Sequence, residues 1–137
     1  MIDHTSNQPA GPVTGMPGLL LRLEGLAIAV LALCFGFTQG LSWLLLLVLF
    51  LVPDLAMLGY LAGNKVGSVV YNATHTLVVP LALLGVGWWV GSDLTVSIAC
   101  IWVAHIAIDR CVGYGLKYPS AFKHTHLSWR DSQDQQT

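Results

Sequence analysis

The chain has 137 residues, of which 55% are hydrophobic and only 9% are charged, and its formal net charge is −1. A soluble domain usually carries about 25% charged residues, so this composition excludes an ordinary soluble protein. The charge gives no reason to expect a nucleic acid as a partner. The three cysteines lie inside apolar stretches without metal-ligand spacing, which favours packing roles over a disulfide framework.

The first 17 residues are polar and rich in glycine and proline. A secretory signal begins with a positively charged segment, but here no lysine or arginine precedes the first apolar stretch. We therefore interpret residues 1–17 as a disordered leader.

Four long apolar segments follow the leader, and they cover residues 18–38, 41–63, 67–91 and 93–116. About 20 helical residues, at ~1.5 Å per residue, cross a hydrocarbon core of ~30 Å. The joints between the segments are short, so neighbouring helices must run antiparallel. Residues 18–116 are therefore predicted to form an all-α, antiparallel bundle of four transmembrane helices in a lipid bilayer. A soluble bundle would need polar helix faces, which residues 41–52 lack.

Pro53 and Pro80 lie inside the second and third segments. Proline removes a backbone donor and clashes one turn back along the helix, so a kink is expected at each. A kink at Pro53 would aim the carboxylate of Asp54 into the bundle. An ordinary membrane-helix proline without a functional role is the alternative.

The basic side chains mark one end of the predicted bundle. All six fall at the start of the first helix, in the second joint, or at and after the end of the fourth helix: Arg22, Lys65, Arg110, Lys117, Lys123 and Arg130. Basic residues gather on the cytoplasmic side of a membrane, so both termini are predicted to be cytosolic. Residues 117–137 are too short and too polar to cross the bilayer, and we expect them to form a tail at the cytosolic interface.

Ionisable side chains from all four predicted helices lie at a similar depth below that end: Glu24, Asp54, His75, His105 and Asp109. Helical rise puts most of them roughly 9–16 Å below the surface. His105 and Asp109 are four residues apart, so they share a helix face. A charge at that depth costs at least about 3 kcal/mol. The carboxylates must therefore be protonated or surrounded by cations.

Carboxylates and imidazoles from separate helices are typical ligands of iron, manganese or zinc. We expect the five side chains to bind one or two divalent metal ions. Two interpretations without a metal remain open: a proton relay or acid–base site, and a structural polar network. The side chains expected to orient the ligands are Tyr71, Asn72, Arg110 and Tyr114. In the tail, His124 and His126 either form a lid over the site or are solvated at the interface.

Several blocks of sequence carry a family resemblance: RLEG, PDLAMLGYLAG, YNATHT, AHIAIDR, GYGLKYP and FKHTHL. Together they resemble an uncharacterised family of small four-helix bacterial membrane proteins, a domain of unknown function, over about residues 18–128. The resemblance implies a four-pass protein of bacterial origin. With the charge pattern, it leads us to expect the bacterial cytoplasmic membrane. The family implies no activity.

The pattern favours a metal-dependent membrane enzyme, either a hydrolase or an oxidase, that acts on a lipid-like substrate entering from the cytosolic leaflet. A small proton- or cation-coupled transporter is one alternative, although the other half of the bundle carries no ionisable residue except Asp93 at its rim. The other alternative is a structural or assembly protein whose polar network fixes the helix register. The sequence also leaves a homo-oligomer open.

Overall fold

The computed structural model describes residues 12–128. Its elements are the α-helices α1 (Gly15–Thr38), α2 (Trp43–Leu49), α3 (Asn64–His75), α4 (Val78–Val90) and α5 (Asp93–Val112), together with the 3₁₀-helix η2 (Val52–Ala62). They make four spans that are long and apolar enough to cross a membrane: α1, α2 with η2, α3 with α4, and α5. The predicted all-α fold with four membrane-spanning helices is confirmed, and we describe the chain as a membrane protein.

The ends of the chain lie partly outside this description. Residues 1–11 of the predicted leader and 129–137 of the predicted tail, including Arg130, are outside the described residues. α1 begins at Gly15, three residues before the expected start, and α5 ends at Val112, four residues before the expected end.

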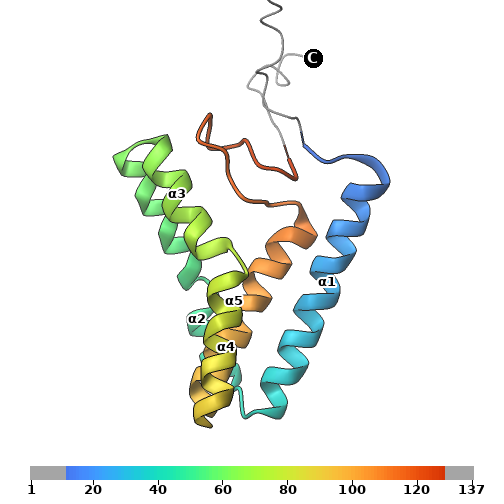
Figure 1. Cartoon of the computed structure of the whole chain (residues 1–137), viewed down its shortest axis with the longest axis vertical. Helices are drawn as coiled ribbons and strands as arrows, with labels where there is room; N and C mark the ends of the chain where they lie inside the picture. The colour runs from blue at the N-terminus through green and yellow to red at the C-terminus, as the bar shows by residue number, and fades with distance from the viewer. Residues whose placement is uncertain (1–11, 129–137) are drawn as a thin grey trace, which may run out of the picture.

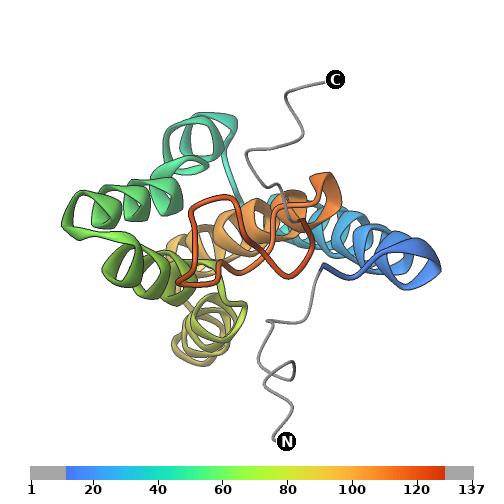
Figure 2. The same ribbon diagram turned by 90° about the horizontal axis from the view of Figure 1, so that it is seen from above.

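Helix α5 is the centre of the bundle. It lies between α1 on one side and the α3–α4 span on the other (Figures 1 and 2), and its main contacts are with α1 and α4. Its buried residues include the small side chains Ala99, Ala104 and Ala107. Lipid gives no hydrophobic drive for helix association, so close van der Waals packing between small side chains must supply it.

The contact between α1 and α5 is an example of such close packing. Gly25, Ala29 and Gly36 are buried on α1, and their spacings of four and seven residues place them on one helix face. A Cβ atom added at Gly25 would lie 2.7 Å from the carbonyl oxygen of Ala107. The two backbones therefore approach at a distance that only glycine allows.

Each predicted proline kink lies where one helix gives way to another: the second span changes from an α-helix to a 3₁₀-helix, and the third span has an extended residue between two α-helices. α2 ends at Leu49, four residues before Pro53. In the third span, Thr76 lies four residues before Pro80 and has an extended backbone, with φ −86° and ψ 141°. The position four residues upstream is where the proline ring meets the carbonyl group of the preceding turn. Each proline thus divides one membrane span into two shorter helices.

Three backbone carbonyl oxygens next to the second break have side-chain donors. Trp102 Nε1 donates to the carbonyl oxygen of Thr74 at 2.7 Å. The guanidinium of Arg110 donates to the carbonyl oxygen of His75 at 3.4 Å. The Tyr71 carbonyl oxygen accepts from the hydroxyl of Thr74 at 3.0 Å. An unpaired backbone group in lipid costs several kcal/mol, so these α5 side chains fix the position of the break.

Residues 113–128 fold back across the end of the bundle (Figure 2). Lys117 and Thr125 form an isolated antiparallel bridge, and the amide of His126 donates to the carbonyl oxygen of Leu116 at 3.2 Å. The amide of Val13, just before α1, donates to the carbonyl oxygen of His126 at 3.0 Å. The tail is therefore a hydrogen-bonded hairpin that is joined to the start of α1.

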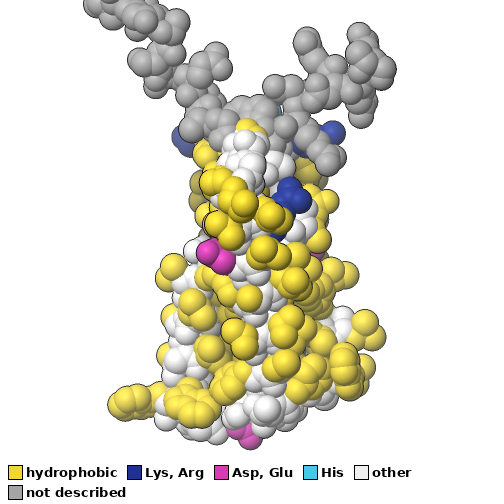
Figure 3. Space-filling model, turned by 90° about the vertical axis from the view of Figure 1, so that its right-hand side faces the viewer, with side chains coloured by type: hydrophobic (Ala, Val, Ile, Leu, Met, Phe, Trp, Pro, Cys, Tyr) yellow, Lys and Arg dark blue, Asp and Glu magenta, His cyan; other side chains and the backbone are white. Residues whose placement is uncertain are grey.

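The surface of the bundle is apolar, with its basic side chains at one end. In the face shown in Figure 3, hydrophobic side chains cover most of the length, and lysine and arginine occur only towards the end that carries the tail. Exposed leucines and valines occur on every span, for example Leu31 at 68%, Leu47 at 78% and Val78 at 72%. This is the surface expected of a protein surrounded by lipid.

The close approach of α1 and α5 can be tested with Gly25→Ala. We expect this change to lower the midpoint of thermal unfolding in detergent, because the added methyl group overlaps the α5 backbone and overpacking costs about 1–3 kcal/mol. Gly85→Ala on α4 is the matched control, since a Cβ atom there meets no atom within 4 Å. Equal unfolding midpoints for the two variants would contradict the contact.

Candidate metal centre

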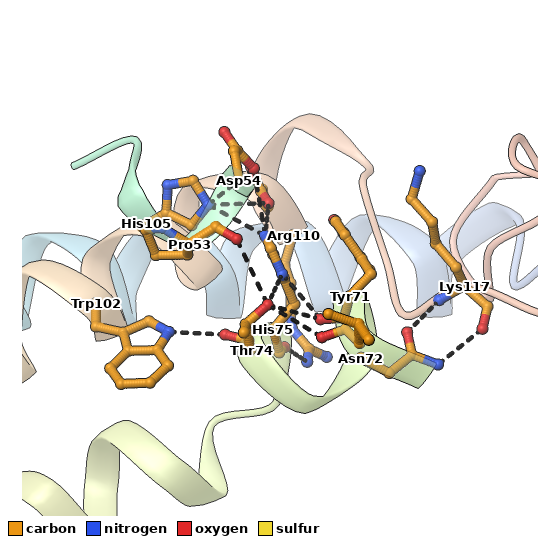
Figure 4. Close-up of polar contacts among 12 residues, drawn as sticks. Pro53, Asp54, Tyr71, Asn72, Thr74, His75, Trp102, His105, Arg110 and Lys117 are labelled. Atoms are coloured by element: carbon orange, nitrogen blue, oxygen red, sulfur yellow. Dashed lines mark hydrogen bonds and ion pairs between the residues drawn. The ribbon is translucent and has the colours of Figure 1, made fainter. Parts of the chain in front are cut away.

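Four of the predicted site residues converge on one point: Asp54, His75, His105 and Asp109. One nitrogen or oxygen atom from each lies within 4.8 Å of all the others. Figure 4 shows Asp54, His75 and His105 turned towards one another. The two histidine side chains are only 3% and 2% exposed, whereas those of Asp54 and Asp109 are 35% and 21% exposed. We call these four residues the Asp/His cluster.

The helix breaks place two members of the Asp/His cluster. Asp54 lies in the first turn of η2, directly after Pro53, and His75 is the last residue of α3. The other two members, His105 and Asp109, lie one turn apart on α5. Asp54 directly follows the first proline, and His75 ends the helix that precedes the second one. Both prolines therefore help to set the direction in which a side chain of the Asp/His cluster points.

Five of the six separations inside the Asp/His cluster fall in a narrow range. The two histidine Nε2 atoms are 3.2 Å apart. Asp54 Oδ1 lies 3.4 Å from each Nε2 atom, and Asp109 Oδ2 lies 3.5 and 3.6 Å from them. Distances of 3.4–3.6 Å are longer than the usual range of about 2.7–3.2 Å for a hydrogen bond. They are close to the edge of about 3.3–3.4 Å expected for a tetrahedron of ligands at ~2.0–2.1 Å from a metal.

The ring of His75 is held in a fixed orientation. Its Nδ1 atom lies 3.0 Å from the Tyr71 carbonyl oxygen and 2.9 Å from the hydroxyl of Thr74. A carbonyl oxygen only accepts, so Nδ1 carries the proton in that contact. The Nε2 lone pair then faces the cluster, as it does in metal-binding histidines whose other nitrogen donates to a carbonyl group.

The ring of His105 is positioned by packing. It meets Phe50 edge-on, with ring centroids 5.1 Å apart. Its Nδ1 atom is buried and has no hydrogen-bond partner among the described residues. The Nε2 atom of His105 therefore makes all its polar contacts within the Asp/His cluster.

No lysine or arginine among the described residues forms an ion pair with the Asp/His cluster. Every ion pair in the part of the chain that the structure describes joins a histidine to Asp54 or Asp109, and no lysine or arginine lies within 4.0 Å of either carboxylate. Two carboxylates and two neutral imidazoles carry a charge of −2. One divalent cation would bring that charge to zero, which a low-dielectric surrounding strongly favours.

Two of the side chains expected to orient the ligands lie beside His75. Tyr71 is buried and its ring stacks on that of His75, with centroids 3.8 Å apart and an interplanar angle of 11°. Tyr71 and Asp109 line the same narrow space. Arg110 contacts the backbone oxygen of His75, not a cluster side chain. Tyr114 is 60% exposed and lines a narrow space next to Asp109.

Asn72 fastens the tail to α3. Its Nδ2 atom donates to the carbonyl oxygen of Lys117 at 2.8 Å, and its Oδ1 atom accepts from the amide of Lys117 at 2.7 Å (Figure 4). The side-chain amide of Asn72 thus makes the two hydrogen bonds that a residue of a neighbouring β-strand would make with Lys117. The role of Asn72 in the structure is therefore to hold the tail above the Asp/His cluster.

Lys117 is a residue near the site that sequence reasoning missed. It is only 7% exposed, and its ammonium group lies 4.8 Å from the ring centroid of Tyr71 and 3.4 Å from that of Phe122. Burial lowers the pKa of the Lys117 ammonium group, and the negative charges of Asp109 and Asp54 partly oppose this shift. A lysine in a polar tail gives no sequence signal of burial, so only the fold of the tail reveals it.

The structure leaves three of the predicted site residues outside the Asp/His cluster. Glu24 is exposed on α1. His126 Nδ1 accepts from the amide of Leu116 at 2.9 Å, and burial lowers the pKa of its ring. His124 Nδ1 lies 2.9 Å from the hydroxyl of Ser120. The two histidines thus contribute to the hairpin of the tail, and the ligand set reduces from five residues to four.

The comparisons with known proteins identify a family but no activity. The sequence model of a family described as "Domain of unknown function (DUF4260)" matches residues 18–129. This match confirms the family resemblance of the sequence. Comparison with the curated proteins and with the solved structures gives no match.

The clamp between Asn72 and the tail can be tested with Asn72→Asp. An aspartate oxygen would face the carbonyl oxygen of Lys117 in place of the donating Nδ2 atom. Because a buried group loses its partner, at a cost of about 1–3 kcal/mol, we expect trypsin to cleave after Lys117 and Lys123 about tenfold faster. Asn64→Asp, at the exposed start of α3, is the control. Cleavage at the same rate in both variants would argue against the clamp.

Proposed function

The chain belongs to this family of unknown function, and we propose that it is a membrane-embedded, metal-dependent enzyme. In this proposal Asp54, His75, His105 and Asp109 bind one divalent metal ion. The single observation that supports it best is the spacing of the four donor atoms. The four separations between a histidine and an aspartate are 3.4–3.6 Å, which suits ligands around a common ion better than hydrogen bonds.

The donor atoms favour iron, manganese or zinc. Two imidazole nitrogens and two carboxylate oxygens form a set that these metals share. The cysteines do not contribute: Cys34 is exposed, and none of the three belongs to the Asp/His cluster. The absence of sulfur ligands argues against a metal such as copper(I), which prefers thiolates and thioethers.

The exposed carboxylates indicate the side from which a substrate would approach. The histidines are buried, whereas Asp54 is partly exposed beside Leu51, Leu55 and Leu58, which are 63%, 62% and 65% exposed. In a membrane these leucines would face lipid, so a lipid-like substrate would reach the metal from that side. The four side chains would fill a tetrahedral site, so an activated water for hydrolysis or oxygen for an oxidation would have to bind as a fifth ligand.

We also propose that the protein lies in the cytoplasmic membrane of a bacterium with both termini in the cytosol. The support is the position of the described basic residues at the end of the bundle that carries the tail: Arg22, Lys65, Arg110, Lys117 and Lys123. Basic residues near the membrane surface gather on the cytoplasmic side.

The metal site can be tested by metal analysis of protein purified in detergent. We expect about one iron, manganese or zinc ion per chain. Asp54→Asn should lower the metal content to well below half an ion, because an amide oxygen binds a divalent cation more weakly than a carboxylate oxygen. Asp54 is partly exposed, so this nearly isosteric change should leave the fold intact, as circular dichroism can confirm.

Glu24→Gln and His124→Gln are the matched controls for the metal analysis. Neither residue belongs to the Asp/His cluster, so both variants should keep the metal content of the original protein. Protein that stays free of metal after incubation with each of the three ions would contradict the proposal. It would favour a proton- or cation-coupled transporter or a structural polar network.

The orientation can be tested with reporter fusions in bacterial cells. Alkaline phosphatase fused to either terminus should be inactive, because this enzyme needs the oxidising periplasm for its disulfides. The same reporter inserted after Gly91, in the joint between α4 and α5, should be active. Activity at the termini and none after Gly91 would reverse the proposed orientation.

A further inference from the structure

A second cavity lies between the tail, α1 and the end of α5. It has a volume of about 300 Å³. Its polar lining residues are Arg22, Tyr114, Lys117, Lys123, Thr125 and Ser128. We call this cavity the basic pocket. It shares Tyr114 with the narrow space beside Asp109, but it contains no member of the Asp/His cluster.

The basic pocket has an excess of positive charge. Arg22, Lys117 and Lys123 line it, and no aspartate or glutamate does. Every ion pair among residues 12–128 involves a histidine, so none of these three cations has a carboxylate within 4.0 Å there. A buried charge without an opposite charge is costly. Binding an anion in the pocket would offset that cost.

Lys117 is the buried one of the three cations, and not all of its N–H donors are used by the described residues. An ammonium group carries three N–H donors, and the only hydrogen bond of Lys117 Nζ to a described residue is to the carbonyl oxygen of Phe122 at 3.2 Å. The remaining contacts of the group are with the faces of aromatic rings, those of Tyr60, Tyr71 and Phe122. Several N–H groups and a guanidinium around one cavity are the arrangement that phosphate oxygens bind.

The walls of the basic pocket are held in place before any ligand binds. Asn72 pairs with the backbone of Lys117, and Lys117 bridges to Thr125 across the hairpin of the tail. Thr125 and Ser128 are joined through their backbone and their hydroxyl groups. Arg22 packs against Gly113, where a Cβ atom would lie 2.8 Å from the guanidinium. A pocket built in this way loses little entropy when it binds a ligand.

The position of the basic pocket at the end of the bundle limits its ligands. It opens where the spans end, at the level of the lipid headgroups, and anionic headgroups are attracted to lysine and arginine there. Phosphate is the anionic group that such headgroups share with soluble phosphorylated compounds.

We propose that the basic pocket binds a phosphate group carried by an anionic ligand. Arg22 and Lys123 contact the phosphate from the open side, and Lys117 contacts it from the buried side. This site is distinct from the Asp/His cluster and does not depend on a metal there. Either an anionic phospholipid or a soluble phosphate compound supplies the group.

Isothermal titration calorimetry of the full chain in a neutral maltoside detergent tests the proposal. The titrants are short-chain phosphatidylglycerol, short-chain phosphatidylcholine and inorganic phosphate. We expect phosphatidylglycerol or inorganic phosphate to bind, and the double variant Arg22→Gln, Lys123→Gln to weaken binding at least about tenfold, since two charged hydrogen bonds are lost. Both positions are exposed, so the variant should fold.

Two further variants make the result specific. Lys65→Gln removes an exposed cation at the same end of the bundle that does not line the basic pocket, and it should change the affinity less than about twofold. Asp54→Asn should keep phosphate binding while it loses metal, which separates this proposal from that of the metal site. Binding of phosphatidylglycerol alone identifies a lipid ligand, and binding of inorganic phosphate identifies a soluble one. No binding to the original protein, or equal losses in Lys65→Gln and the double variant, would overturn the proposal.

Discussion

The candidate site depends on the way in which the helix break after His75 is stabilised inside the membrane. A broken helix leaves carbonyl oxygens without donors, and lipid provides none. Beside the second break, Trp102 and Arg110 of α5 donate to these oxygens, and the ring of His75 donates to another. The same bonds that make the break tolerable also orient His75. The helix break and the orientation of the proposed metal ligand His75 therefore depend on the same contacts, two of which come from α5.

The Asp/His cluster and the tail are joined by a stack of side chains. Lys117 lies over the ring of Tyr71, and Tyr71 stacks on His75. Asn72, next to Tyr71 on α3, holds the backbone of Lys117. A change in the position of the tail would thus alter the surroundings of His75 without touching a metal ligand. Lys117 lines the basic pocket and His75 belongs to the Asp/His cluster, so a ligand in the pocket is well placed to influence the cluster through this stack.

Much of this structure could be predicted from the sequence, because helix length, proline position and depth in the membrane follow from simple periodicity. The four spans, a bend at each proline and the common depth of Asp54, His75, His105 and Asp109 were accessible in this way. The depth of a residue in the membrane does not tell which way its side chain points. Glu24 lies at the depth of the Asp/His cluster, but its side chain is exposed. The face of α1 that packs on α5 contains Gly25, and each residue turns the helix by about 100°, so Glu24 points away. The spacing of Gly25, Ala29 and Gly36 was the available signal for that inner face. Burial of Lys117 had no such signal, since it arises from the hairpin of the tail.

The distribution of polar groups along the bundle favours chemistry at one membrane face over passage through the membrane. From residue 25 to 53, from 76 to 92 and from 94 to 104 the sequence has no aspartate, glutamate, histidine, lysine or arginine. Asp93, in the first turn of α5, is alone at the opposite end among the described residues. A transported ion would have to cross this half without an ionisable partner, at a cost that lipid makes high. A substrate that approaches through the bilayer, in contrast, needs only the half that contains the Asp/His cluster and the basic pocket.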